Sequence, residues 1–352
     1  MIEKLTKEAI LLLQNMIAKP SFSSEEDETA LLIMQWFSTH DVKFESNNHN
    51  VWAKNKHFDA SKPTILLNSH HDTVKPNKGF NRDPFHAEVI DGKLYGLGSN
   101  DAGGCLVSLL ATFAHFYKKE NLKYNLVIVA SAEEESSGQK GLNSMLPIIP
   151  PIDVAIVGEP TLMQLAIAEK GLLVLDCYAH GKAAHAAHGL GDNAIYKAMD
   201  AMNWFKNYQF HKISDTLGKV KMTVTQINAG SQHNVVPAEC HFVVDIRVTD
   251  AYSNQEVLDI VKENVDVEVK ARSLRLNSSS IPVTHELVEA GITLGRSTYG
   301  SPTLSDQSVL SCPSLKLGPG DSLRSHTADE FIYVIEIEEG IKLYIDLLKK
   351  IL

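Results

Sequence analysis

The first part of the chain alternates segments of helical periodicity with short apolar runs that are typical of buried strands. Near the N-terminus, Ile10, Leu13 and Ile17 recur at helical spacing and predict an amphipathic helix. Further helices are predicted at 28–40 and 103–120, and strands at 62–70, 124–132 and 151–160. This alternation favours an α/β fold, in which helices cover both faces of a sheet.

The order of predicted elements changes at about residue 170. Strands are predicted at 171–181, 219–230, 238–249 and 266–274, and helices at 193–208 and 254–265. This β-α-β-β-α-β order is typical of a small ferredoxin-like module. The alternation of helical and strand segments seen in the first part of the chain returns after the polar segment 276–282. We therefore interpret the module as an insertion. We therefore predict an open mixed-sheet α/β domain at 1–169 and 278–352, interrupted by an α+β domain at 170–277.

Composition narrows the class of protein. A chain of 352 residues is long enough for two domains, and its 44% hydrophobic and 22% charged content is ordinary for a globular protein. The formal net charge of −10, without a basic run, argues against nucleic acid as a partner. The apolar runs are too short for a membrane span, and the N-terminus lacks a signal-peptide pattern, so we expect a cytoplasmic protein that binds a small molecule.

The cysteines give no sign of a metal knuckle or a disulfide framework. Four cysteines stand far apart along the chain, at positions 105, 177, 240 and 312. Neither a CxxC motif nor a close-spaced pattern of pairs is present. We expect them to be buried small hydrophobic residues.

The segment "SHHDTV" places two histidines and an aspartate at the end of a predicted strand. Side chains alternate in an extended segment, so His70 and Asp72 share one face and His71 lies on the other. A metal-bound imidazole usually donates its second N–H to a carboxylate, and Asp72 lies where that role requires. We predict that His70→Ala loses bound metal and that His71→Leu retains it. Alone, the segment could equally be a polar turn.

Further carboxylates and one histidine follow other predicted strands or stand in turns. Asp101 lies in the glycine-rich "YGLGSNDAGG", Glu159 in "IVGEPT", and His326 in "GPGDSLRSHTADE". Three adjacent carboxylates in "VASAEEESSG" repel one another unless a cation is near, although a solvated acidic turn is an alternative. In open α/β sheets, ligands bind beyond the carboxyl ends of strands. The combined nitrogen and oxygen set suits zinc or a similar divalent metal.

Charge counting favours two metal ions over one. If Asp101, Glu135 and Glu159 are ligands, they contribute three negative charges, and one bridging hydroxide brings the total to four. Two divalent ions neutralise that charge, whereas a single zinc ion leaves an excess. Two metal ions about 3.5–4 Å apart form a known type of hydrolytic site.

Taken in chain order, the five motifs around His70, Asp101, Glu134-Glu135, Glu159 and His326 resemble those of a zinc amidohydrolase and peptidase family. This family contains acetylornithine deacetylase, succinyl-diaminopimelate desuccinylase and glutamate carboxypeptidase. The resemblance covers essentially the whole chain, including the inserted module. It implies that one zinc ion is held by His70, Asp101 and Glu159, and the other by Asp101, Glu135 and His326. It also implies that Glu134 is the general base and that Asp72 supports His70. Cobalt or manganese could substitute for zinc.

The resemblance also implies a mechanism and an assembly. Glu134 would take a proton from the attacking water and pass it to the leaving amine of a hydrolysed amide. The inserted domain would form a homodimer and act as a lid. His185, with His188 less favoured, would reach the partner's active site and stabilise the oxyanion.

The resemblance also supplies candidate residues for substrate binding. Asn234 and Arg247 match stretches where the family binds substrate, although Arg247 could equally be an exposed strand arginine. The backbone of Gly318 and Gly320 could bind a carboxylate in the same way. Arg324, two residues before His326, is hypothesised to contact a substrate carboxylate at the site mouth.

The chain departs from the family pattern at three positions near the bridging aspartate. Many relatives have arginine where this chain has Leu97, and Met-Lys where it has Ala102 and Gly103. The triplet Glu133-Glu134-Glu135 also leaves the register of base and ligand open, and we assign the last two residues. None of these departures removes a ligand.

Within this family, the similarity is greatest to acetylornithine deacetylase. We expect removal of an acyl group from an ornithine-, citrulline- or lysine-like amino acid, in arginine biosynthesis. Alternatives in the family are a succinyl-diaminopimelate desuccinylase, an N-acetyl-lysine deacetylase and a dipeptidase or aminoacylase. A metal-free scaffold homologue is the alternative outside enzymes, and the presence of all five ligands and the base argues against it.

Overall fold

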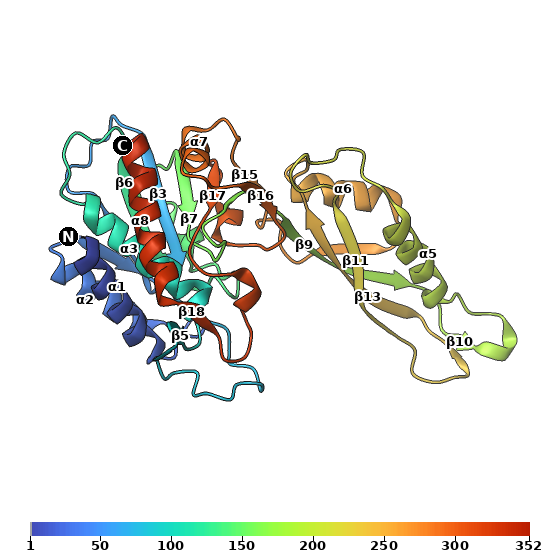
Figure 1. Cartoon of the computed structure of the whole chain (residues 1–352). Coiled ribbons are helices and arrows are strands. Elements are labelled where there is room, and N and C mark those ends of the chain that lie inside the picture. Colours follow the sequence, from blue (N-terminus) through green and yellow to red (C-terminus); the bar gives the residue numbers. More distant parts are fainter. Residues whose placement is uncertain (1) are drawn as a thin grey trace. The chain divides into compact units, whose positions relative to one another are not determined.

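The computed structural model describes residues 2–352, and the chain divides into two compact units (Figure 1). Unit 1 comprises Met1–Ile167, Ser280–Tyr299 and Ser305–Leu352. Unit 2 comprises Ala168–Ser279 and the short segment Gly300–Leu304. The sequence boundaries of the insertion, 170 and 277, lie within two residues of the main segment of unit 2. The contribution of Gly300–Leu304 to unit 2 was not predicted.

A nine-stranded mixed sheet is the central layer of unit 1. Its strands β6, β3, β7 and β17 are parallel neighbours, and the hairpin β1–β2 joins β6 in antiparallel fashion. In sheet order the strands are β1 (Phe44–Asn47), β2 (Asn50–Lys54), β6 (Asn125–Ser131), β3 (Thr64–His70), β7 (Val154–Val157), β17 (Ser314–Lys316), β8 (Leu165–Glu169) and β15 (Ser279–Ser280), with β16 (Thr298–Ser301) paired to β8. The mixed α/β architecture predicted from the sequence is confirmed.

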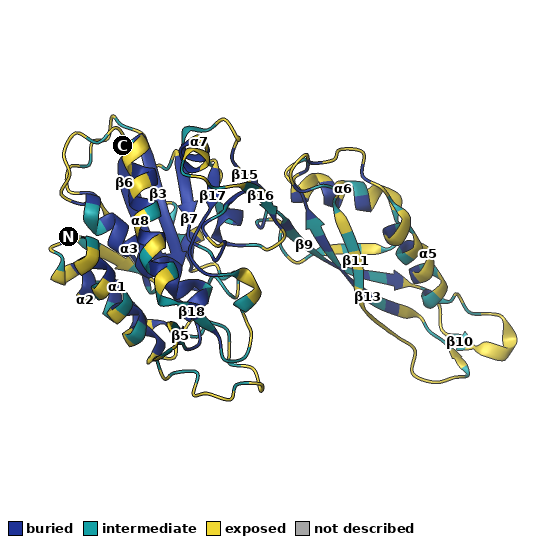
Figure 2. Cartoon of the chain, viewed as in Figure 1, coloured by how far each residue is buried: buried dark blue, intermediate teal, exposed yellow. Residues whose placement is uncertain are grey.

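The long helices of unit 1 all contribute to one core cluster, on the sheet face that carries Ile65 and Leu67. These helices are α1 (Ile2–Ile17), α2 (Asp27–Thr39), α3 (Gly104–Phe116), α7 (Glu286–Thr293) and α8 (Val334–Ile351). Leu66 points to the opposite face, where a smaller cluster includes the four-residue helix α4 (Leu142–Met145). Figure 2 shows the buried sides of the helices and strands in dark blue. Helices therefore lie on both faces of the sheet, as expected, but the second face carries only the short helix α4.

A small antiparallel sheet in unit 1 was not predicted from the sequence. It consists of β4 (Glu88–Ile90), β5 (Lys93–Tyr95) and β18 (Phe331–Tyr333). The turn η1 (Ser99–Gly103) follows β5 and leads into α3. This sheet therefore joins the segment before Asp101 to the segment after His326.

Unit 2 has the predicted ferredoxin-like arrangement. Its antiparallel sheet has the order β11 (Lys221–Ala229), β13 (Glu239–Val248), β9 (Gly171–His180) and β14 (Glu268–Ala271). Helices α5 (Ala194–Asn207) and α6 (Asn254–Asn264) contribute to one apolar cluster with alternate residues of β9 and β13. Two short strands, β10 (Ala184–His185) and β12 (Val235–Val236), form a separate ladder.

None of the four cysteines in the described residues forms a disulfide bond. Cys105, Cys177 and Cys240 are buried free thiols, and Cys312 is a half-buried one. Burial raises the pKa of Cys177 to about 12, as expected for a cysteine that packs as a hydrophobic residue. Among residues 2–352, no helix combines the length and the apolar character that a membrane crossing requires.

Candidate metal centre

Three parallel strands bring their carboxyl ends to one edge of the central sheet. Strand β3 lies between β6 and β7, and His70 is its last residue. The triplet 133–135 begins two residues after the end of β6, and Glu159 lies two residues after the end of β7. Because parallel neighbours end at the same edge, side chains distant in sequence meet there.

His70, Asp101 and Glu159 form the first ligand group. The imidazole of His70 is buried, and its Nδ1 lies 3.0 Å from the backbone carbonyl oxygen of Asp72. Since that oxygen can only accept, Nδ1 carries a proton. The opposite nitrogen, Nε2, faces Asp101 Oδ1 at 3.4 Å and Glu159 Oε1 at 3.8 Å. In the neutral imidazole this geometry directs the Nε2 lone pair at two carboxylates, as in a metal-binding histidine.

Asp101, Glu135 and His326 form the second ligand group. Nε2 of His326 lies 3.0 Å from Glu135 Oε2 and 3.6 Å from Asp101 Oδ2. Asp101 therefore faces one histidine with each of its two carboxylate oxygens. The structure brings the five predicted ligands together in the two sets of three that the resemblance implies, with Asp101 common to both.

The donor set fits divalent metal ions. Within each group the ligand atoms lie within 4.8 Å of one another. Burial lowers the pKa of His70, but the carboxylates of Asp101 and Asp72 outweigh it and raise that pKa well above its usual range. Glu135 raises the pKa of His326 to about 9. The negative potential that favours protons on both imidazoles also favours cations, and imidazole with carboxylate ligands suits zinc and similar metals.

Asp72 supports two parts of the site at once. Its backbone carbonyl accepts from His70, and its Oδ1 lies 3.4 Å from the same Nδ1. Its two carboxylate oxygens also accept the backbone N–H groups of Glu134 at 3.0 Å and Glu135 at 3.1 Å. The Ser23 hydroxyl donates to the same carboxylate at 2.7 Å. Asp72 therefore holds the loop after β6 in addition to the predicted contact with His70.

The two glutamates assigned as base and ligand face the ligand groups. Glu134 Oε2 lies 3.9 Å from Nε2 of His70, and Glu135 contacts His326. Glu133 is buried and accepts from the Ser24 hydroxyl at 2.7 Å and from the backbone of Lys140 at 3.0 Å. The first member of the triplet is thus held by structural contacts, which agrees with the assignment of the last two to chemistry.

Burial raises the pKa of Glu134 well above its usual range, and the charges of Glu159, Asp306 and Glu135 add to that effect, whereas His70 opposes it. A carboxyl group with a raised pKa can accept a proton and hold it until transfer to a leaving group. The geometry and the electrostatics of Glu134 therefore suit a general base that later acts as an acid.

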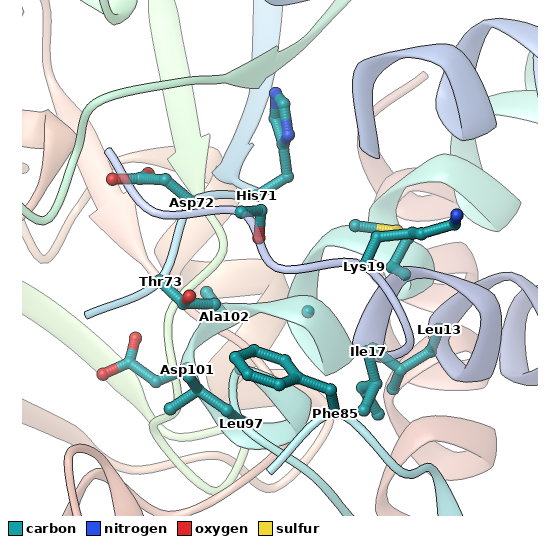
Figure 3. A pocket seen from close by; sticks show the side chains of 14 residues that line it. Leu13, Ile17, Lys19, His71, Asp72, Thr73, Phe85, Leu97, Asp101 and Ala102 are labelled. Carbon is teal, nitrogen blue, oxygen red and sulfur yellow. The ribbon is translucent and has the colours of Figure 1, made fainter. Parts of the chain in front are cut away.

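His71 lies apart from both ligand groups. Its ring is buried, with Nδ1 2.8 Å from the Thr29 hydroxyl and Nε2 3.1 Å from the backbone carbonyl of His49. Burial lowers its pKa to about 4, so the ring is neutral. Figure 3 shows that the side chains of His71 and Asp72 point in different directions.

Sequence reasoning missed a buried carboxylate behind the loop that carries Glu134. Glu26 has no exposed surface, and its Oε1 accepts the backbone N–H groups of Ser24 at 2.7 Å and Glu133 at 3.1 Å. Its Oε2 lies 2.8 Å from Nδ1 of His49. The only signal for it was the acidic stretch before α2, which is also the usual composition of a helix N-terminus.

Two of the three predicted substrate-binding groups in unit 1, the Arg324 guanidinium and the Gly318 N–H, are engaged within the protein. The Arg324 guanidinium binds both carboxylate oxygens of Glu336, at 2.7 and 2.6 Å, and lies over Phe331. The Gly318 N–H donates to the Thr161 hydroxyl, which leaves it no free donor for a substrate carboxylate. The carbonyl of Gly320 accepts from the backbone of Leu162. The Gly318 N–H is thus committed within the protein, and the roles of Arg324 and Gly320 toward substrate stay predictions.

The remaining predicted residues lie in unit 2. His185 is an exposed residue of β10, and its Nδ1 accepts from the backbone of Ala187 at 3.2 Å. The rings of His185 and His188 lie 5.2 Å apart. The carbonyl of Asn234 accepts from Ala186, and Arg247 pairs with Asp245 at 2.9 Å. Their roles toward substrate stay predictions.

A mixed α/β unit whose strand ends carry two groups of carboxylate and imidazole ligands, joined by one aspartate, has the architecture of a metal-dependent hydrolase. The chain belongs to peptidase family M20/M25/M40, whose family model matches residues 66–350. The family resemblance inferred from the motifs is confirmed.

Individual relatives agree with this class. A curated acetylornithine deacetylase from Shigella sonnei (strain Ss046) is 28% identical over an alignment that covers 90% of this chain and 91% of the relative. The structure of aminopeptidase PepT from Bacillus cereus ATCC 10987 has a TM-score of 0.78 at 18% identity, covering 100% of this chain and 99% of that chain. The YXEP protein of Bacillus subtilis, described as a dinuclear metal binding peptidase, has a TM-score of 0.74 at 14% identity and 98% coverage of both chains. These two structures show the shared fold.

Proposed function

We propose that the protein is a dizinc deacylase that removes the acyl group from an N-acyl amino acid, with N-acetylornithine as the first candidate. The observation that carries the proposal is Asp101, whose two oxygens face the histidines of two separate ligand groups, at 3.4 and 3.6 Å. The Glu134 carboxyl, 3.9 Å from His70, lies beside them. Two cations bound there would polarise the amide carbonyl and acidify a water molecule.

The side chains of this protein supply the proton transfers. Water adds to the carbonyl carbon, and its proton moves to the Glu134 carboxylate. The carbon–nitrogen bond then breaks, and the Glu134 carboxyl group returns the proton to the leaving amine. Asp72 holds both His70 and the loop of Glu134 in position, because its backbone carbonyl accepts from His70 and its carboxylate accepts from the backbone N–H of Glu134. The products are a carboxylate and a free amino acid, and no covalent intermediate with the protein is required.

The choice of an N-acyl amino acid over a peptide is supported by the acetylornithine deacetylase relative, which matches 90% of this chain. Deacetylation of N-acetylornithine would place the protein in arginine biosynthesis. N-acetylcitrulline, N-succinylornithine, succinyl-diaminopimelate and N-acetyl-lysine share the same scissile amide next to an amino-acid body. Dipeptides are the alternative class, because several proteins of this fold are named peptidases.

A panel of substrates tests the proposal. We expect the zinc-loaded protein to hydrolyse one N-acyl amino acid with a kcat/KM at least roughly 100-fold above that for dipeptides, because a pocket built for a polar group rejects analogues that lack it. Release of the free amine is measured for the five N-acyl compounds above and several dipeptides, after loading with zinc, cobalt or manganese. A dipeptide with a higher kcat/KM than every N-acyl amino acid in the panel would overturn the proposed substrate class. Absence of bound metal in the protein as purified and after loading would overturn the metal mechanism.

We also propose that the protein is a homodimer in which His185 completes the active site of the partner subunit. The exposed position of His185 in unit 2, held by an N–H from Ala187, supports a role toward a group outside its own unit. Strand β11 supports a dimer because it is an edge strand of its sheet and most of its residues are exposed. A neutral or charged imidazole can donate a hydrogen bond to a developing oxyanion.

Mixed dimers provide the test of this arrangement. We expect His185→Ala and Glu134→Gln each to inactivate the homodimer, and a 1:1 mixture after subunit exchange to recover about a quarter of the wild-type activity. Half of the mixed population would be heterodimers with one intact site, made from Glu134 of one subunit and His185 of the other. The same mixing experiment, with His188→Ala in place of His185→Ala, is the control for the neighbouring histidine. Absence of any recovery, with exchange verified by mass labels, would place His185 outside the partner's site.

A further inference from the structure

Glu330 is a buried carboxylate that none of the chemistry above uses. It lies four residues after His326, immediately before β18, and is 1% exposed. Isolated buried carboxylates are costly unless their oxygens are bonded. The contacts of this side chain therefore need an explanation in terms of what they hold.

Both oxygens of Glu330 bind the backbone of the loop that carries Asp101. Oε1 accepts the N–H groups of Asn100 at 2.8 Å and Asp101 at 2.9 Å. Oε2 accepts the N–H of Gly98 at 3.2 Å. The backbone carbonyl of Glu330 adds a bond from the N–H of Gly96 at 3.0 Å. A single residue thus binds four of the N–H groups that precede the Asp101 side chain.

The loop has little regular structure of its own at this point. Gly98 is in the left-handed region with φ of +75°, and Asp101 and Ala102 have non-helical backbone angles inside η1. Asn100 has no exposed surface, so its N–H has no access to bulk water. A buried backbone N–H group that finds no acceptor costs free energy comparable to a lost hydrogen bond. The Glu330 carboxylate therefore replaces the regular hydrogen bonds that this loop lacks.

A small cavity borders the loop that carries Asp101. A cavity of about 20 Å³ lies there, lined by Leu97, Gly98, Asp101, Ala102 and Gly103 together with apolar residues of α1 (Figure 3). Its volume is close to that of one water molecule. Figure 3 shows the Asp101 carboxylate pointing away from the apolar side chains of Leu13 and Ile17.

We propose that Glu330 is a positioning residue of the metal centre, whose carboxylate fixes the loop backbone so that Asp101 presents one oxygen to each ligand group. The inference rests on the proposed dizinc function, because its consequence is the affinity for cations. Asp101 is common to both groups, so a shift of its loop weakens both at once. Glu330 itself is not a member of either ligand group.

Metal affinity is the measurement that tests this role. In Glu330→Gln one oxygen acceptor becomes an NH₂ donor that opposes a backbone N–H. We expect a loss of about 10- to 100-fold in metal affinity, as is usual when a partner of a ligand is removed. The affinity is measured by competition with a chelator, and the cobalt-substituted proteins are compared by their visible spectra. We expect kcat to recover at excess metal with KM little changed, a pattern that simple destabilisation does not give.

Asp329→Asn is the matched control. Asp329 is the neighbouring carboxylate and also accepts backbone N–H groups, those of Asn81 and Arg82 at 2.9 Å each, but it holds a different loop. We expect this variant to bind metal with wild-type affinity. Glu330→Asp keeps the carboxyl group but shortens the side chain by one methylene, and we expect it to have an intermediate metal affinity. This variant provides the test if Glu330→Gln does not fold.

Two results would overturn the proposal. One is a Glu330→Gln or Glu330→Asp protein whose metal affinity and cobalt spectrum equal those of wild type and Asp329→Asn. The other is a loss of affinity that is fully explained by a lower unfolding temperature of the metal-free variant. Both leave the proposed function intact, because the wild-type protein still binds metal. A wild-type protein that binds no metal would instead overturn both the proposed function and this inference.

Discussion

Glutamine in place of Glu134 is expected to lower kcat about a thousandfold while leaving KM within a few-fold of wild type. The carboxamide has nearly the same shape as the carboxylate but cannot accept a proton at neutral pH. Glu134 is not a member of either ligand group, so the variant should retain its metal ions. Its backbone N–H bond to Asp72 does not involve the substituted side chain and should keep the loop in place.

The adjacent carboxylate provides the control for this prediction. Glu133 binds the Ser24 hydroxyl and the Lys140 backbone instead of facing the ligand groups. We expect Glu133→Gln to keep kcat within a few-fold of wild type, with a small loss of stability. Rates are measured with the best substrate of the panel, alongside the metal content of each variant. Equal losses of kcat in both variants would refute the assigned register, and a Glu134→Gln enzyme within tenfold of wild type would refute the role of the base.

Much of the fold could be predicted because its elements carry strong periodic signals. The helix at α1 and the buried strands β3, β6 and β7 follow directly from the spacing of apolar residues. The hairpin β1–β2 and the sheet β4–β5–β18 were missed. Their strands are only three to five residues long. Strand β18 also pairs with β5 over a separation of more than two hundred residues, which local patterns do not encode.

The ligands of the candidate site were predictable for two reasons. His70, Glu135 and Glu159 follow buried strands, where an α/β sheet places its functional residues, and the motif order supplied Asp101 and His326. The residues that hold these loops were missed. Glu26 and Glu330 act through side-chain bonds to backbone N–H groups of distant segments. A carboxylate of this kind has the same local sequence signal as a surface residue, so only its three-dimensional contacts identify it.

Asp101 is expected to decide the metal content of the whole site, because it is the one residue shared by both ligand groups. Glu159 belongs only to the group of His70, and Glu135 only to the group of His326. Removal of an unshared ligand should weaken one cation, whereas removal of the shared ligand should weaken both. Variants of the shared and unshared ligands are therefore expected to differ in the number of metal ions bound per chain.

We expect wild type to bind about two metal ions per chain, Glu159→Ala and Glu135→Ala about one each, and Asp101→Ala close to none at the same metal concentration. The Asp101→Ala enzyme should lose activity by more than about a thousandfold, because both cations contribute to hydrolysis. His71→Leu is the control, since His71 is buried beside His70 but bonds only to Thr29 and the His49 carbonyl. It should retain both ions. Metal content is measured by elemental analysis after dialysis against a fixed free zinc concentration. An Asp101→Ala protein that keeps two ions would show that the carboxylate does not bridge, and the charge balance behind the two-metal assignment would fail with it.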